Sequence, residues 1–347
     1  MAISGNRYFI QQYSHDEYVH GGVGYADAEE ILLRKGYKKI VFPHYNDFSF
    51  RAKFSRFFYL FTILFSVKSG SDVVFIFPVF AKLNKLLIRL LKFKESIRLI
   101  CFIADIDGIK DGNSALLKKE IRSFKKYDLF ILHNQAMRSW LHGHIPEANC
   151  TAIEFFDFLA NPFDGTRTKS FEIVFAGNLV KSSFLEKLFV LKNNSPELHF
   201  NLYGPGVSEA MTAQSNVSYL GIYQPRQLVA VLQGSFGLVW DGTEIDIPGG
   251  SLWDYMQYIS HHKLSLYILS GLPLIVSETA ASAPLVRKYG IGFTIKTFYE
   301  ITEKISAITD EEYRRMRSNM IPLAEKISSG NCLKNALDGL MKNSGID

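Results

Sequence analysis

The sequence predicts an α/β protein built from two consecutive Rossmann-like domains. Short apolar runs typical of strands alternate along the whole chain with segments of helical spacing. Several of these runs are apolar throughout, such as VVFIF and LICFI, as expected of parallel strands that helices cover on both faces. With 347 residues, the chain is too long for one ordinary domain and about right for two. We therefore expect two sheets whose strand carboxyl ends face a central cleft.

Five strands are expected in each half, and a segment rich in turn formers separates the halves. This segment, 161–166, is followed directly by a new strand, so we place a first domain at 1–165, a second at 166–325 and a helical tail at 326–347. The predicted strands are 8–13, 39–42, 73–79, 97–103 and 128–133 in the first half, and 172–176, 199–203, 236–240, 273–276 and 291–295 in the second.

The composition excludes several classes of protein. Hydrophobic residues make up 47% of the chain and charged residues 21%, so the chain is not disordered. A net charge of +5 is too small for a histone-like protein, and no nucleic-acid partner is expected. The three cysteines lie far apart, which argues against a disulfide framework or a cysteine zinc site. No signal peptide is visible, and the longest apolar run, 57–67, is about half a membrane span, so we expect a cytoplasmic protein.

Basic residues are concentrated in one stretch of the first half. Residues 51–98 contain ten basic and only two acidic side chains, and in 81–98 the basic residues alternate with Leu, Ile and Phe at helical spacing. Such a mixture suits a peripheral contact with an anionic membrane surface. The alternative is a helix packed on the sheet with a solvated basic face.

Two strand ends in the second half are candidates for binding an anion. Gly177 and Asn178 form a tight turn between the strand 172–176 and a helix, where a free helix N-terminus and Lys181 could meet a phosphate. Lys263 lies near the start of the helix expected over 262–270, and Asp241 follows the strand 236–240. The alternatives are a simple strand-to-helix connection and a solvent-facing lysine.

Two segments of the first half could carry further chemistry. Asp105 and Asp107 follow the strand 97–103, where carboxylates could serve as a general base or hold a metal ion. After the first strand, His20 precedes Gly21, Gly22 and Gly24. This second segment fails the dinucleotide fingerprint because it ends in Asp27 in place of Gly or Ala, so its glycines are expected to let an acceptor approach the backbone.

The order and wording of seven segments resemble a known enzyme family. ADIDGIK, HNQAMRSWL, FFDFL, FAGNLVKSSFL, FNLYGPG, GSFGLVWDG and HHKLSLYILSGLPLIV follow one another in the chain. They are similar to the bacterial β-1,6-galactofuranosyltransferases of cell-surface polysaccharide synthesis, such as that of O-antigen. More distantly, they resemble the glucosyltransferase that extends GlcNAc on serine-rich repeat adhesins. The resemblance covers nearly the whole chain.

The resemblance implies a GT-B fold with an acceptor-binding N-terminal domain and a nucleotide-sugar-binding C-terminal domain. It also implies UDP-galactofuranose, or another UDP-hexose, as the donor. Its donor site would comprise Gly177, Asn178, Lys181, Tyr203, Asp241, His262, Lys263 and Ser265. The chain departs from the family pattern at Ala104, where the family has His, at 108–110, where it has Ser-Leu-Arg, and at 259–263, where it has Asn-Asn-Pro-His-Lys.

The expected reaction follows from these residues. Helix N-termini together with Lys181, His262 and Lys263 could stabilise the leaving diphosphate, so we expect no cofactor and no metal. Inversion at the sugar would require a base, for which Asp105, Asp107 and His20 are the candidates. The expected acceptor is a lipid-linked oligosaccharide at the inner membrane leaflet, approached through Gly21, Gly22 and Gly24. Alternatives are another UDP-hexose transferase of the same family, with a protein or glycan acceptor, and a catalytically inactive scaffold that binds nucleotide-sugar.

Overall fold

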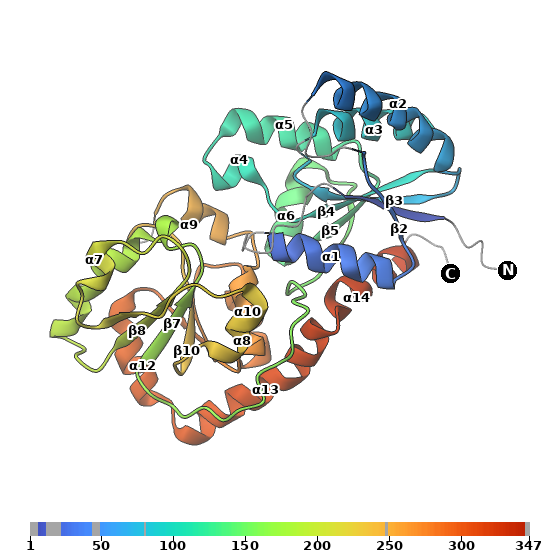
Figure 1. The fold of residues 1–347 in the computed structure, drawn as a ribbon. Coiled ribbons are helices and arrows are strands. Elements are labelled where there is room, and N and C mark those ends of the chain that lie inside the picture. The colour runs from blue at the N-terminus through green and yellow to red at the C-terminus, as the bar shows by residue number, and fades with distance from the viewer. Residues whose placement is uncertain (1–5, 12–21, 44–48, 80, 247–248, 344–347) are drawn as a thin grey trace. The chain divides into compact units, whose positions relative to one another are not determined.

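The described part of the chain forms two compact units. The computed structural model describes residues 6–11, 22–43, 49–79, 81–246 and 249–343 (Figure 1). Unit 1 comprises Met1–Ile153 and Leu333–Asp347, and unit 2 comprises Glu154–Cys332. The expected boundary at residue 165 thus lies inside unit 2, and the end of the expected helical tail lies in unit 1.

Unit 1 is built on a parallel six-stranded sheet in the order β2-β1-β3-β4-β5-β6. Its strands are β1 (Arg7–Ile10), β2 (Lys38–Ile40), β3 (Asp72–Phe77), β4 (Arg98–Ile103), β5 (Leu129–Leu132) and β6 (Asn149–Ala152). Its helices are α1 (Val23–Arg34), α2 (Phe50–Ser66), α3 (Lys82–Lys92), α4 (Asp107–Lys110), α5 (Ser114–Phe124), α6 (Gln135–His144) and α14 (Asn331–Asn343).

Unit 2 repeats this architecture with the strand order β12-β11-β10-β7-β8-β9, again parallel. Its strands are β7 (Glu172–Ala176), β8 (His199–Tyr203), β9 (Val217–Tyr219), β10 (Phe236–Val239), β11 (Leu274–Ser277) and β12 (Gly292–Ile295). Its helices are η2 (Leu179–Lys181), η3 (Ser183–Asn193), α7 (Glu209–Thr212), α8 (Pro225–Val231), α9 (Ser251–Met256), α10 (His262–Leu269), α11 (Ala283–Tyr289), η4 (Phe298–Glu300), α12 (Ile301–Ala307) and α13 (Asp310–Ser328).

Burial explains why the central strands are apolar throughout. All six residues of β3 and all four of β10 are buried, because helices cover both faces of each sheet (Figure 1). The α/β prediction is confirmed, and all ten predicted strands are present. The short edge strands β6 and β9, NCTA and VSY, were not predicted because a segment of three or four residues with polar members carries little periodic signal.

Local sequence signals fix the ends of several helices. In α13, Thr309 and Glu312 form a capping box, in which each side chain accepts a hydrogen bond from the other residue's backbone N–H. In α14, Asp338 pairs with Lys35 at 2.6 Å, which ties this C-terminal helix to α1 within unit 1.

Across the described residues, no helix combines the length and the hydropathy that a membrane span requires.

Candidate functional site

The loops after β7 and β8 meet through two glycines. Gly177 N–H donates to the Tyr203 carbonyl at 3.0 Å, and Gly204 has φ = +124°, in the region that favours glycine. A Cβ on Gly204 would lie 1.9 Å from the Gly177 oxygen, so no side chain fits at this position. The backbones of the two loops are therefore in direct contact at the carboxyl edge of the sheet, the edge where ligands bind in parallel α/β proteins.

Lys263 lies beside Gly177. A Cβ on Gly177 would be 3.0 Å from the Lys263 Cε, so the glycine leaves space beside the lysine. The ammonium is 4.1 Å from the centroid of the Phe175 ring and forms a cation–π contact with it. Lys263 is in the first turn of α10, and the first N–H groups of a helix have no partner within the helix itself.

Asp241 connects Lys263 to a histidine, His261. Its carboxylate lies 3.3 Å from Lys263 Nζ and 2.6 Å from His261 Nε2. Because an ionised carboxylate only accepts hydrogen bonds, the His261 Nε2 must carry the proton of the shorter contact. All three side chains are at least four-fifths buried, so these charges interact with little screening by water.

The environment of Asp241 has opposing effects on its pKa. Burial alone would raise the pKa of this carboxyl, but the charges of Lys263 and His261 and their hydrogen bonds lower it, and together they hold it well below its usual range. Asp241 therefore stays ionised at every physiological pH. The cluster of Asp241, His261 and Lys263 is hereafter called the strand-end triad.

His261 was missed by the sequence analysis, which named His262 in its place. His262 is exposed at the first position of α10 and stacks on Phe156, with ring centroids 4.1 Å apart. His261 occupies the N-cap position, and its buried Nδ1 has no hydrogen-bond partner in the described structure. The position of His261 in the sequence could have indicated it. A residue just before a helix start is held near the carboxyl edge of a parallel sheet, where ligands bind.

Two predicted donor-site residues are buried and form hydrogen bonds within the protein. Ser265 is fully buried and donates to the Phe156 carbonyl at 2.5 Å. The ring of Tyr203 is buried, and its hydroxyl donates to the Val231 carbonyl and accepts from the Gln233 N–H. Both side chains face the core, which sequence spacing alone did not reveal.

Asn178 and Lys181 lie on the exposed turn that follows β7. The Asn178 side chain accepts from the Val180 N–H at 3.0 Å and caps the short helix η2. Lys181 is exposed at the end of this helix. The structure thus places Gly177, Asn178 and Lys181 on one turn and the strand-end triad beside it.

The two aspartates of unit 1 share a lysine. Lys110 Nζ lies 3.1 Å from Asp105 and 2.8 Å from Asp107, at the carboxyl end of β4. Burial would lower the pKa of Lys110, but the two carboxylates outweigh it and raise the pKa, so the lysine stays charged. Among the described residues, no group of three His, Cys, Asp or Glu side chains is arranged to hold a metal ion.

Glu120, which was not among the predicted site residues, stabilises this turn through hydrogen bonds. Its carboxyl accepts the Asp107 and Gly108 N–H groups at 3.1 and 2.8 Å. Burial raises its pKa to about 7, although the hydrogen bond from Gly108 opposes this. Gly108 must be a glycine, because a Cβ there would lie 2.4 Å from the Leu117 backbone.

The glycine segment after β1 is described only in part. Gly22 is the N-cap of α1, and Gly24 is in its first turn. Among the described residues, no atom lies within 4 Å of a Cβ placed on Gly22. The chain passes from β1 to β2 and then returns to β3 on the other side of β1, so this helix start follows a switch point of the sheet. His20 and Gly21 lie outside the described residues.

Two parallel sheets, each with covering helices, and a cationic site at a strand end define the class of GT-B glycosyltransferases. The chain matches two domains of one family: the glucosyltransferase 3-like N-terminal domain over residues 7–145 and the glucosyltransferase 3-like C-terminal domain over residues 173–340. The chain belongs to the glucosyltransferase 3-like family and is a glycosyltransferase, which confirms the resemblance seen in the sequence.

Individual relatives agree with this assignment. The chain is 27% identical to beta-1,6-galactofuranosyltransferase WbbI of Escherichia coli (strain K12), over 80% of this chain and 81% of the relative. It is 28% identical to glucosyltransferase 3 of Streptococcus gordonii, over 84% of each chain. Its fold resembles that of Anabaena Alr3699/HepE, solved with UDP and glucose, with a TM-score of 0.57, 12% identity, and coverage of 93% of this chain and 95% of that one.

Proposed function

We propose that this glycosyltransferase transfers a hexose from a UDP-hexose, with UDP-galactofuranose as the first candidate donor. The observation that carries the proposal is the position of Lys263, whose ammonium lies at a helix start beside the bare backbone of Gly177. A diphosphate placed there would meet an ammonium and free N–H groups, which stabilise the negative charge that grows on a leaving UDP. Asn178, Lys181 and His262 complete the proposed diphosphate site.

The donor sugar is proposed from the relatives. WbbI carries the name of a galactofuranosyltransferase and the streptococcal relative that of a glucosyltransferase, at almost equal identity to this chain. UDP-glucose is therefore the second candidate. A related proposal is that the diphosphate is held without a metal ion, because Lys263 and the helix start already supply positive charge. The alternative of an inactive scaffold rests on Ala104, which replaces a family histidine.

We expect Lys263→Ala to weaken UDP binding about 10- to 100-fold, because a charge-assisted hydrogen bond is lost. UDP affinity would be measured by thermal shift and calorimetry, and turnover by a panel of UDP-galactofuranose, UDP-galactopyranose, UDP-glucose and UDP-GlcNAc with EDTA present. Lys181→Ala serves as a second variant that cannot disturb the triad, because Lys181 is exposed. Lys192→Ala, an exposed lysine on η3, is the matched control.

The possible results distinguish an active transferase from an inactive scaffold and test the proposed diphosphate site. Transfer from one donor under EDTA, with UDP binding reduced in Lys263→Ala and intact in Lys192→Ala, supports the proposal and identifies the sugar. UDP binding without turnover of any donor would favour the inactive scaffold. If UDP stabilises neither the wild type nor the variants, the proposed diphosphate site is wrong.

We further propose that the acceptor is a lipid-linked oligosaccharide and that unit 1 contacts an anionic membrane surface. Helix α2 exposes one stripe of phenylalanines, here called the phenylalanine ridge: Phe50, Phe54, Phe57, Phe58, Phe61 and Phe65. Their spacing places them on one face of the helix, opposite the buried Ala52, Leu60 and Ile63.

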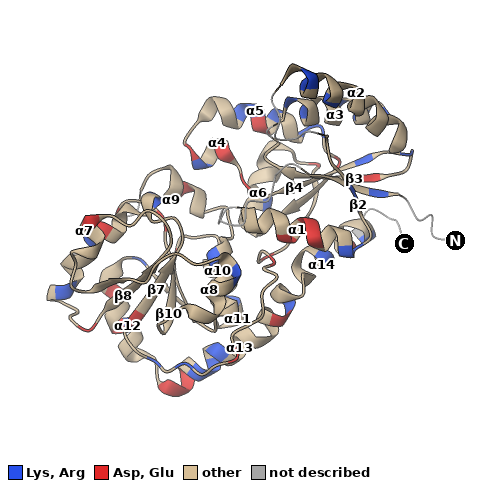
Figure 2. Cartoon of the chain, in the orientation of Figure 1, with Lys and Arg blue, Asp and Glu red and all other residues tan. Residues whose placement is uncertain are grey.

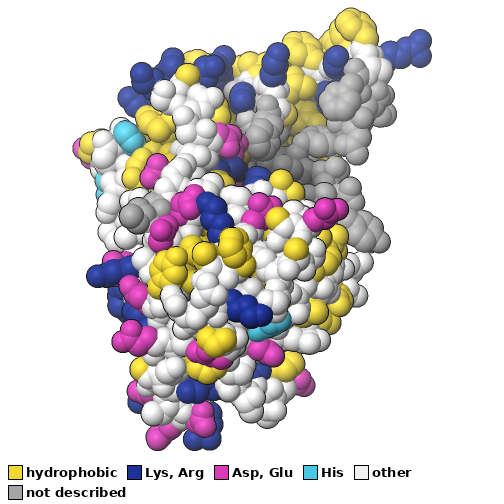
Figure 3. Space-filling view, turned by 90° about the vertical axis from the view of Figure 1, so that its left-hand side faces the viewer, with side chains coloured by type: hydrophobic (Ala, Val, Ile, Leu, Met, Phe, Trp, Pro, Cys, Tyr) yellow, Lys and Arg dark blue, Asp and Glu magenta, His cyan; other side chains and the backbone are white. Residues whose placement is uncertain are grey.

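Basic side chains accompany the ridge. Arg51, Lys53 and Arg56 lie on α2 itself, and α3 adds three lysines and one arginine (Figure 2). Figure 3 shows hydrophobic and basic side chains side by side over the part of unit 1 at the top of the view. A bilayer surface offers anionic headgroups to cations and an apolar interior to exposed aromatic rings. We therefore propose that the protein binds peripherally to the inner leaflet.

We expect Phe54→Ser/Phe58→Ser to reduce binding to vesicles containing 30% phosphatidylglycerol about tenfold or more, because two large apolar side chains no longer enter the bilayer. Phe54 is 56% exposed, and the control Phe189→Ser removes a phenylalanine of unit 2 that is 57% exposed. Co-sedimentation measures binding. Unchanged vesicle binding, combined with loss of self-association in the double variant, would assign the ridge to a protein contact.

A further inference from the structure

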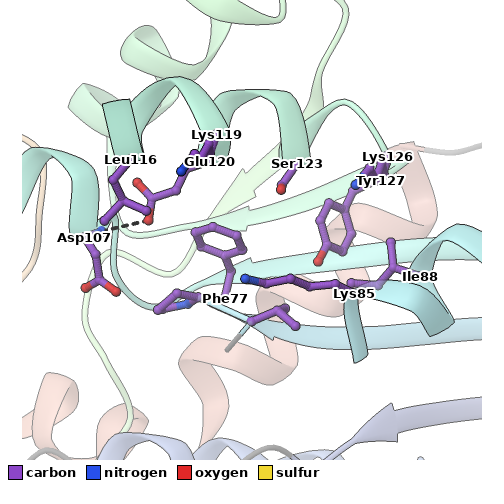
Figure 4. A pocket seen from close by; sticks show the side chains of 12 residues that line it. Phe77, Lys85, Ile88, Asp107, Leu116, Lys119, Glu120, Ser123, Lys126 and Tyr127 are labelled. Carbon is purple, nitrogen blue, oxygen red and sulfur yellow. Dashed lines mark hydrogen bonds between the residues drawn. The ribbon is translucent and has the colours of Figure 1, made fainter. Parts of the chain in front are cut away.

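A second pocket lies in unit 1, at the carboxyl ends of β3 and β4 between α3 and α5 (Figure 4). Its volume is about 140 Å³, and it is separate from the strand-end triad, which belongs to unit 2. Its lining includes three lysines, of which Lys85 and Lys119 are exposed, and two hydroxyl groups, and these five residues are here called the lysine pocket: Lys85, Lys119, Ser123, Lys126 and Tyr127.

The lysines of this pocket have no resident counter-ion. Within the part of the chain that the structure describes, no carboxylate forms an ion pair with Lys85, Lys119 or Lys126. Burial lowers the pKa of Lys126, and repulsion from Arg89 and Lys85 lowers it further. The folded protein thus gathers positive charge at this place against electrostatic repulsion.

The hydroxyl groups are also available to a ligand. Tyr127 is 7% exposed, and its hydroxyl makes no hydrogen bond with the described residues. Figure 4 shows the Ser123 and Tyr127 hydroxyls and the Lys85 side chain directed into the space between α5 and the β3–α3 connection. Burial raises the pKa of Tyr127, so its hydroxyl keeps its proton and can donate.

The acidic groups of the pocket already have partners. Glu120 accepts two backbone N–H groups, and Asp107 pairs with Lys110 at 2.8 Å. Glu120 lies beside Lys119 in Figure 4, but among the described residues neither acid forms an ion pair with the three lysines of the pocket.

We propose that the lysine pocket binds a diphosphate group, and that this group is the one that joins the acceptor glycan to its lipid carrier. Three ammonium groups and two hydroxyl donors suit an anion of two to three charges with many acceptor oxygens better than a single carboxylate. Helix α3, which carries Lys85, packs against α2, the helix whose exposed face carries the phenylalanine ridge, so a carrier that enters the bilayer at the ridge would have its diphosphate near this pocket. The identity of the carrier rests on the proposed function, whereas binding of a diphosphate does not.

The test measures binding of inorganic pyrophosphate, with saturating UDP present to occupy the donor site. We expect Lys85→Ala/Lys126→Ala to reduce pyrophosphate affinity about tenfold or more, because two charge-assisted contacts are lost. The control Lys118→Ala/Lys125→Ala removes two exposed lysines that do not line the pocket. UDP affinity should be equal in all three proteins. The pocket variant should also remain folded, since it removes mutually repelling charges.

Two further ligands identify the source of the anion. Farnesyl diphosphate should lose affinity in the pocket variant in parallel with pyrophosphate. Vesicles containing phosphatidylglycerol test whether the lysines only attract headgroups. The proposal is overturned if the pocket variant and the control variant bind pyrophosphate with equal affinity. It is also overturned if the pocket variant loses only vesicle binding and keeps its affinity for pyrophosphate. Because UDP binding is measured separately, a failure of the donor-site proposal is recognised independently of this result.

Discussion

Replacing Asp241 with Asn is expected to lower the free energy of unfolding by about 3 kcal/mol at pH 7. The carboxylate lies between Lys263 and His261, and all three side chains are largely buried. Without the negative charge, the Lys263 ammonium would remain desolvated with no anion beside it, which is the costly half of a broken ion pair. Urea unfolding followed by circular dichroism measures the difference.

The same variant has a defined pH dependence. Burial raises the pKa of Asp241, but Lys263 and His261 outweigh it and hold the folded-state pKa well below the unfolded value of about 3.9. The carboxylate therefore contributes stability that is complete above about pH 5 and is lost as the pH falls below the unfolded value toward the folded one. The gap between wild type and variant should stay constant from pH 8 to 5 and narrow below that. Asp254→Asn, an exposed acid on α9, should show no such gap. Equal stability of wild type and Asp241→Asn at pH 7 would contradict the electrostatic account of the triad.

The second large effect concerns turnover. We expect Asp105→Asn to reduce kcat about 10²- to 10⁴-fold with little change in UDP affinity, if this carboxylate takes the proton of the acceptor hydroxyl. Asp105 is the more accessible aspartate of its turn, with 36% of its side chain exposed against 18% for Asp107. An amide has nearly the same shape but cannot accept that proton. Transfer to acceptor, measured under saturating donor, gives the rate.

Asp107→Asn is the matched comparison for this prediction. Asp107 forms the shorter contact with Lys110 and starts α4, so it positions the turn and should cost less activity when replaced. Near-wild-type turnover in Asp105→Asn would remove it as the base. His20, the third candidate, would then be tested in the same assay through His20→Ala.

The sequence predicted the repeated architecture because long buried strands leave a plain signal. Five or more apolar residues in a row, as in β3 and β4, indicate a strand covered on both faces. The edge strands β6 and β9 are short and partly polar, so their pairing is set by the neighbouring strand, which no local pattern reveals. The assignment of the C-terminal helix α14 to unit 1 depends likewise on tertiary contacts, such as Lys35 with Asp338.

The candidate site was predicted by position more reliably than by side-chain direction. Strand ends and helix starts located Gly177, Asp241 and Lys263 correctly on the same edge of the sheet. Whether a given side chain faces that edge or the core depends on the helix phase, and for Ser265 and His261 the phase was not evident from spacing. Glu120 was missed because it is remote in sequence from the turn whose N–H groups it accepts.

The contact between Gly177 and Gly204 has a consequence for how such a transferase changes its sugar. The backbones of the loops after β7 and β8 touch, with no space for a side chain between them. Neither loop can therefore take an insertion or a bulkier residue at this contact unless the other loop moves. Evolution is therefore expected to preserve these two loops and to vary the donor through the longer segment 243–258, which lies after Asp241 and carries α9. Within that segment Ile245, Trp253 and Met256 belong to the core of unit 2, so we expect the variation to fall on the exposed residues between them.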